Sequence, residues 1–184
     1  MTTVNGLPAH ILLVHAIVVL LPLAALLLVL SALWPAGRRK VAGPNAILSV
    51  LVVVLVPITT EAGEWLERRV ASTPLVRTHT ELGDTALYVA IPVAVLAVVV
   101  WWRHRESLQG QATDTASAGS TAVATRRRTL LAPASTAVTV VIAVLSIAAA
   151  GAAWYDVYRI GDSGAQATWQ GQFSSSPAAR GADR

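Results

Sequence analysis

Histidines near the ends of apolar segments are the residues of this chain best suited to chemistry. His10 and His15 lie in the first turns of a segment that stays apolar to Trp34, and His79 precedes a later apolar segment. Imidazole binds zinc, copper and iron, and two histidines on different helices are able to ligate a b-type haem from both faces. All three are candidate cofactor ligands. His10 and His15 would lie about 140° apart around one helix, so they are not expected to face the same pocket. His10 and His79, on different helices, are therefore the more plausible pair of ligands.

Three carboxylates, Glu61, Glu64 and Asp84, are candidate ligands for a divalent metal at the same end of the chain's apolar segments. The number of residues from each group to the nearest basic residue at the other end of its apolar segment is similar for His15, Glu61 and Asp84. At a rise of about 1.5 Å per helical residue, their depths in the membrane agree within roughly 6 Å. Ionisable groups at membrane depth are costly and usually face a bundle interior or a wet cavity. Three interpretations stay open: a metal or haem site, a proton or ion pathway, or helix caps that pair with arginines at the interface.

The elements that must position these residues are predicted to be membrane-spanning helices. Of the 184 residues, 54% are hydrophobic and only 13% are charged, whereas a soluble domain carries about 25% charged residues. Crossing the hydrocarbon core takes about 20 apolar residues. Four uncharged stretches meet this need: Ala16–Gly37, Val41–Thr60, Thr85–Trp102 and Thr129–Tyr155. We expect an all-α, up-down four-helix transmembrane bundle over residues 5–171, with helices at about 8–34, 44–68, 74–103 and 129–158.

Two segments outside these helices are expected to be disordered: a cytoplasmic linker over residues 106–125 and a tail over residues 172–184. Both are rich in Ala, Ser, Thr and Gly, a composition that favours flexible chain. The last helix carries small residues four apart at Ser135, Thr139 and Ala143. Because small side chains let helices approach closely in lipid, this helix is predicted to be the packing spine of the bundle.

The charge distribution predicts how the chain lies in the membrane. Eight Lys and Arg and two acids fall in the loops near residues 38–40 and 103–128, whereas six Arg and eight acids fall elsewhere. Basic loops stay in the cytoplasm, so both termini are expected outside the plasma membrane. This bias explains the net charge of +4 without a nucleic-acid partner. The expected partners are the lipid bilayer and either another membrane protein or a second copy of the chain.

No sequence motif indicates an enzyme activity. The chain contains no cysteine, which excludes disulfides, thiolate metal sites and cysteine nucleophiles. It also lacks a phosphate-binding loop, a zinc-protease helix and a serine-nucleophile turn. A non-catalytic accessory subunit therefore remains an alternative to a cofactor-binding or ion-conducting protein.

Four stretches together resemble a family of small bacterial membrane proteins, the domain-of-unknown-function family 2231. They are NGLPAHILLVHAIVVLLPLAAL, TTEAGEWLERRV, HTELGD and RIGDSGAQATW. The resemblance covers residues 5–171 except the linker, and its most specific parts are the paired histidines, Glu61-Ala62-Gly63-Glu64, and His79 with Gly83-Asp84. It implies four helices and no established activity. In similar sequences a histidine often follows the glycine where Asp162 stands here, so any role of that position as a histidine ligand does not carry over.

Overall fold

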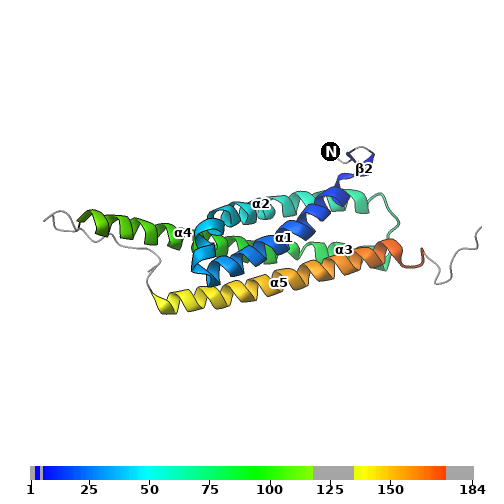
Figure 1. The fold of residues 1–184 in the computed structure, drawn as a ribbon. Coiled ribbons are helices and arrows are strands. Elements are labelled where there is room, and N and C mark those ends of the chain that lie inside the picture. The colour runs from blue at the N-terminus through cyan, green and yellow to red at the C-terminus, as the bar shows by residue number, and fades with distance from the viewer. Residues whose placement is uncertain (1–2, 5, 118–134, 173–184) are drawn as a thin grey trace, which may run out of the picture.

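The computed structural model describes residues 3–4, 6–117 and 135–172. A short antiparallel hairpin precedes the helices, formed by the two-residue strands β1 (Thr3–Val4) and β2 (Leu7–Pro8), with Gly6 at a φ of +82°. The helices are α1 (Ala9–Leu33), α2 (Pro35–Glu67), α3 (Pro74–Gly83), α4 (Ala86–Ser117) and α5 (Thr136–Trp169). The expected all-α fold class is thereby confirmed (Figure 1).

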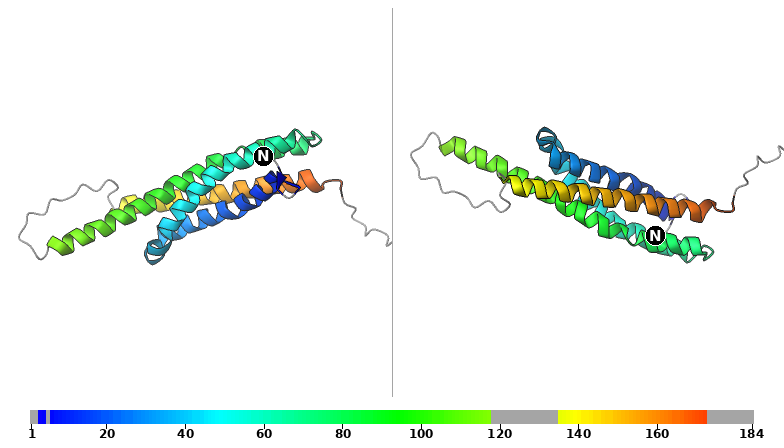
Figure 2. Two further views of the ribbon diagram at one scale, coloured as in Figure 1. Left: turned by 90° about the horizontal axis from the view of Figure 1, so that it is seen from above. Right: turned by 90° about the horizontal axis from the view of Figure 1, so that it is seen from below.

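Four membrane-length spans run up and down through the bundle. By length and apolar composition, α1, α2, α3 together with α4, and α5 are each able to cross a bilayer. Helix α1 packs against α2 and α5, and α4 packs against α2 and α5, so the four spans form a closed square. Two further views show the spans running alongside one another (Figure 2). The N-terminus, the α2–α3 connection and the C-terminal end of α5 lie at one end of this square (Figure 1). We call it the histidine end, because His10 and His79 lie there, and we call the opposite end, which carries Arg38 and Arg103, the basic end.

Small and aliphatic side chains fill the interior. Leu21, Ala24, Leu28, Val93 and Ala153 are at most 1% exposed, and alanine at such positions lets neighbouring helix backbones approach closely. The outward faces carry exposed Leu, Val, Ile, Trp and Tyr side chains, which in a bilayer face lipid. The packing therefore follows the arrangement of a membrane bundle, with small residues inside and large apolar residues outside.

The structure corrects the predicted start of the second helix. Helix α2 begins at Pro35, directly after the single non-helical residue Trp34, and not near Pro44. Proline suits the first helical turn because its missing N–H would have no partner there. Pro44 lies inside the helix on an exposed face. A proline at that position removes one backbone hydrogen bond, but it does so near the basic end, where water is able to satisfy the freed carbonyl.

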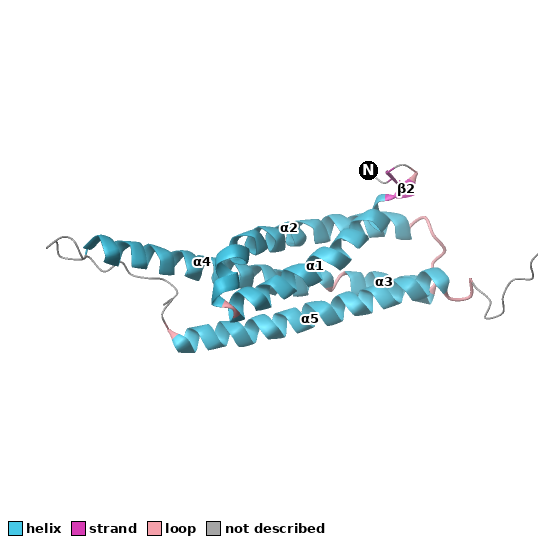
Figure 3. Cartoon of the chain, in the orientation of Figure 1, coloured by secondary structure: helices cyan, strands magenta, loops and turns pink. Residues whose placement is uncertain are grey.

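The predicted third helix is two helices with a break. Thr73 caps α3, since its hydroxyl accepts a hydrogen bond from Val76 N at 3.2 Å and Pro74 follows as the first helical residue. Helix α3 then ends at Gly83, and α4 starts at Ala86, with two residues between them (Figure 3). Helix α4 continues through Ser117, so the first half of the predicted linker is helical. The rest of that linker lies outside the described residues, as does the tail from residue 173.

Helix α5 differs from the predicted fourth helix at both ends and in its role. It starts at Thr136, not near residue 129, and continues to Trp169, past the predicted end at residue 158. Only 17% of its most apolar stretch is buried, compared with 28–33% in the other spans. Its most apolar stretch is therefore the least buried of the four, which does not fit a packing spine. Small residues allow close packing, but they do not decide how many neighbours a helix has.

Candidate functional site

His10 lies in the first turn of α1 and packs against α2. Its Nδ1 is 3.0 Å from the carbonyl oxygen of Thr59. A carbonyl only accepts hydrogen bonds, so Nδ1 carries the proton and donates it. A Cβ at Gly63 would lie 3.0 Å from Nδ1 and Cε1 of His10. The glycine therefore leaves the space on α2 that the imidazole occupies.

His79 of α3 is held against α5 in the same way. Its Nδ1 is 3.1 Å from Ser163 Oγ, and Ser163 Oγ donates to the carbonyl oxygen of Ile160 at 2.9 Å. Because the only proton of that hydroxyl is used, Ser163 accepts from His79 and Nδ1 again carries the proton. A Cβ at Gly164 would lie 2.9 Å from His79 Cε1, so a glycine also makes room for this ring.

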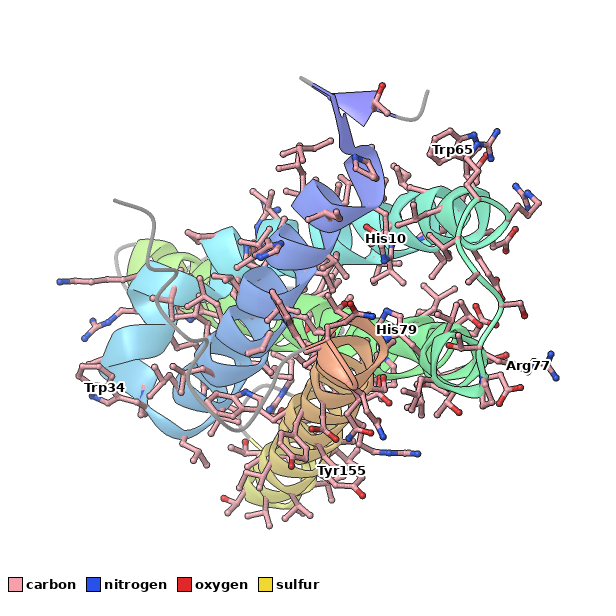
Figure 4. The ribbon with its side chains drawn as sticks, turned by 90° about the vertical axis from the view of Figure 1, so that its right-hand side faces the viewer. His10, Trp34, Trp65, Arg77, His79 and Tyr155 are labelled. Carbon is pink, nitrogen blue, oxygen red and sulfur yellow. The ribbon has the colours of Figure 1, made fainter. Side chains whose placement is uncertain are left out.

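The two imidazoles meet between the helices. Their ring centroids are 6.4 Å apart and their planes are inclined by 75° (Figure 4). In the neutral form of each ring, a proton at Nδ1 leaves a lone pair on Nε2. Metal-binding histidines usually donate their other ring N–H to a carbonyl, carboxylate or water, which fixes the ring and its tautomer. The pair expected from the sequence therefore has the hydrogen bonds typical of metal ligands.

Both histidines line one cavity of about 50 Å³ at the histidine end. At 10–15 Å³ for each water, it has room for roughly three to five water molecules. Apart from the histidines, Thr59 and Thr60, its walls are aliphatic side chains of α1, α2, α4 and α5 together with Gly83 of α3. An apolar cavity with a few convergent polar groups is the usual form of a small-molecule or cofactor site.

The other predicted ligands do not join this pair. His15 is exposed and its Nδ1 contacts the Ile11 carbonyl of its own helix. Glu61 and Asp84 are exposed, and Glu64 is 62% exposed beside Arg68, with 3.7 Å between their charged groups. In residues 3–4, 6–117 and 135–172, no three His, Asp or Glu side chains converge to hold a metal ion. Similar depth did not bring these residues together, because they lie on different sides of their helices.

Asp156 of α5 is a buried acid that the sequence analysis did not select. It is 7% exposed, and its Oδ1 is 2.7 Å from the hydroxyl of Thr85 in the break between α3 and α4. Its Oδ2 has no hydrogen-bond partner among the described residues. The signal was present in the sequence, because Ala153, Ile160 and Ser163 follow the i, i+3, i+4, i+7 spacing of one helical face. Ending the helix at residue 158 hid it.

The site at the histidine end thus consists of two adjacent imidazoles, two glycines beside them and a small apolar cavity. Comparison of the chain with family models, with curated proteins and with solved structures finds no match.

Proposed function

We propose that this chain is a multi-pass plasma-membrane protein of bacteria that binds b-type haem between His10 and His79. The observation that carries the proposal is the pair of Nδ1-protonated imidazoles with centroids 6.4 Å apart. Both rings line one cavity, so His10 and His79 are the residues that would hold the haem iron.

The number of ligands favours haem over a metal ion held by protein groups alone. The porphyrin supplies four nitrogens, so two histidines complete the six-coordinate iron of a cytochrome. A structural zinc site would need four protein ligands, and in the described part of the chain no third His, Asp or Glu joins the pair. A haem held by two histidines supplies one-electron transfer. The chain's own part is to fix both ring orientations through Thr59 and Ser163 and to surround the centre with aliphatic side chains.

The size of the cavity supports a second candidate, a bare transition-metal ion. A volume of about 50 Å³ accommodates an ion with a few waters, whereas a porphyrin ring requires the walls of the cavity to separate. Haem binding therefore implies that α1 and α3 move apart at the histidine end. Copper or zinc bound by imidazole would need no such movement.

Absorption spectra of the protein purified in mild detergent test the proposal. We expect a Soret band in protein from haem-supplied cells, and loss of that band in His10→Ala and in His79→Ala. His15→Ala and His104→Ala are matched controls that leave the pair intact and should keep the spectrum. Metal analysis of colourless protein distinguishes the bare-ion candidate. A wild-type protein without haem and without stoichiometric metal would refute both.

The proposed orientation places the basic end in the cytoplasm and both termini outside. Its support is the excess of Lys and Arg in the loops at the basic end. Because the chain has no cysteine, single-cysteine variants give a clean test. A membrane-impermeant thiol reagent applied to intact cells should label Ser72→Cys, in the α2–α3 connection, and spare Arg39→Cys. The reverse pattern would refute the orientation.

A further inference from the structure

Two arginines share a small cavity at the basic end. Its volume is about 10 Å³, all four spans contribute to its walls, and its polar lining consists of Arg38, Arg103 and Thr139. The other lining residues are apolar and at most 9% exposed: Ala32, Val100 and Ile142. Among the described residues that line this cavity, none is acidic. The cavity therefore combines two positive charges with apolar walls.

Arg103 of α4 is held beside the cavity by α5. Its side chain is only 6% exposed, and Nη2 donates to Thr139 Oγ1 at 3.1 Å. The hydroxyl of Thr139 in turn donates to the carbonyl oxygen of Ser135 at 2.8 Å, so its oxygen is left to accept from the arginine. A guanidinium keeps its charge in proteins. Thr139 thus fixes a permanent positive charge inside the end of the bundle.

Arg38 of α2 reaches the same cavity from a partly buried position. Its Nε and Nη2 donate to the carbonyl oxygens of Ser31 and Ala32 at 2.6 and 2.7 Å. A guanidinium has five N–H groups, so these two bonds leave donors unused. In residues 3–4, 6–117 and 135–172, Arg38 makes no further hydrogen bond or ion pair. Capping the end of α1 explains the position of Arg38 and leaves donors for a ligand.

Tryptophans place this cavity at the surface of the membrane. Trp34 and Trp102 are 58% and 43% exposed at the same end of the bundle, and exposed indoles favour the depth of the lipid headgroups. Residues 34–40 and 101–107 contain five Lys and Arg against a single acid, Glu106, which accepts from Trp102 Nε1 at 3.1 Å. Basic pockets between spanning helices at this depth bind anionic lipid headgroups.

We propose that Arg38 and Arg103 bind the phosphate group of an anionic phospholipid. Guanidinium groups match the geometry of phosphate oxygens. A cavity of about 10 Å³ holds roughly one oxygen-sized atom, so one phosphate oxygen enters it. The rest of the headgroup lies at the membrane surface beside Arg38. The acyl chains keep a lipid phosphate at this depth, whereas a free phosphate ion must leave bulk water each time it binds. This site does not depend on the histidine pair.

Thermal unfolding of the purified full chain in detergent, with lipid added, tests the site. Phosphatidylglycerol should raise the unfolding temperature to a saturating value. Phosphatidylcholine with the same acyl chains should raise it less, because two arginines repel its cationic choline. Arg103→Gln still donates to Thr139 but lacks the charge, so it should weaken phosphatidylglycerol binding roughly tenfold or more. Arg39→Gln removes the same charge from an exposed neighbour and should change the affinity by less than about twofold.

Four outcomes would overturn the proposal. Equal stabilisation by the two lipids would exclude recognition of an anion. Equal weakening in Arg39→Gln and Arg103→Gln would assign the binding to the general surface charge. Stabilisation by inorganic phosphate as large as that by phosphatidylglycerol would identify a site for a free anion. If Arg103→Gln does not fold, Thr139→Val removes the hydroxyl that holds Arg103 and should weaken binding severalfold; unchanged affinity would exclude the role of Arg103.

Discussion

Replacing Gly164 by alanine tests whether His79 is held where the structure places it. The new Cβ would lie 2.9 Å from Cε1 and 3.2 Å from Nδ1 of His79. Carbon atoms in favourable contact are about 3.5–4.0 Å apart, so the ring must move by roughly 0.6–1 Å. Such a movement strains or breaks the hydrogen bond from His79 to Ser163.

The expected magnitude follows from two opposing effects. Alanine in place of glycine inside a helix stabilises by about 0.8–1 kcal/mol. Overpacking costs about 1–3 kcal/mol, which includes about 1 kcal/mol for a weakened hydrogen bond. Gly161 lies one turn earlier on the same helix, and a Cβ there meets nothing within 4 Å. Gly161→Ala should therefore stabilise the protein, while Gly164→Ala should be about 1–3 kcal/mol less stable than Gly161→Ala.

Equilibrium unfolding in mixed detergent micelles measures both variants, and a double-mutant cycle identifies the cause. In a His79→Ala background the clash is gone, so Gly164→Ala should become as favourable as Gly161→Ala. The interaction term between Gly164→Ala and His79→Ala should reach at least about 1 kcal/mol, as expected for residues in contact. Equal stability of the two glycine variants in the wild-type background would refute the placement of His79. A penalty that survives His79→Ala would assign the clash to another neighbour.

Two further predictions concern the rest of the bundle, and both use the same unfolding assay. Asn45 is fully buried with no hydrogen-bond partner for Oδ1 or Nδ2 among the described residues, so Asn45→Leu should stabilise by about 1–2 kcal/mol; a loss of stability would show that an unseen polar group satisfies the amide. Arg38 donates to the carbonyl oxygens of Ser31 and Ala32 at 2.6 and 2.7 Å, where the end of α1 leaves them without helical partners. Arg38→Ala should destabilise by about 2 kcal/mol, whereas Arg39→Ala, an exposed neighbour, should change stability by less than about 0.5 kcal/mol.

Local features of the chain were readable from the sequence. Four apolar stretches of about 20 residues indicated four spans, because each helix satisfies its own backbone and bilayer thickness sets its length. The cap at Thr73 with Pro74 was also predictable, since capping depends on a few adjacent residues. Helix boundaries were harder. The predicted boundaries at residues 44 and 158 were both wrong, since α2 begins at Pro35 and α5 continues to Trp169.

The candidate site was likewise predictable from the sequence only in part. Sequence spacing indicated that His10 and His15 point in different directions and that His79 is the better partner for His10, because helical periodicity is a local rule. It also suggested a shared layer with Glu61 and Asp84, which the structure does not form. Depth along a helix is countable from sequence, but the direction in which a side chain points into a bundle depends on how every helix is rotated against its neighbours.

Chain composition and periodicity alone therefore determined that this protein is a bundle of four apolar spans with three of its four histidines near one end. Only the tertiary structure decided that Gly63 and Gly164 make room for two adjacent imidazoles, and that a break between α3 and α4 brings Thr85 to Asp156. The physical reason is the sequence separation over which each interaction acts. The apolar composition and the backbone hydrogen bonds of a spanning helix are local to one segment, whereas a hydrogen bond between residues 71 positions apart exists only after separate helices have packed.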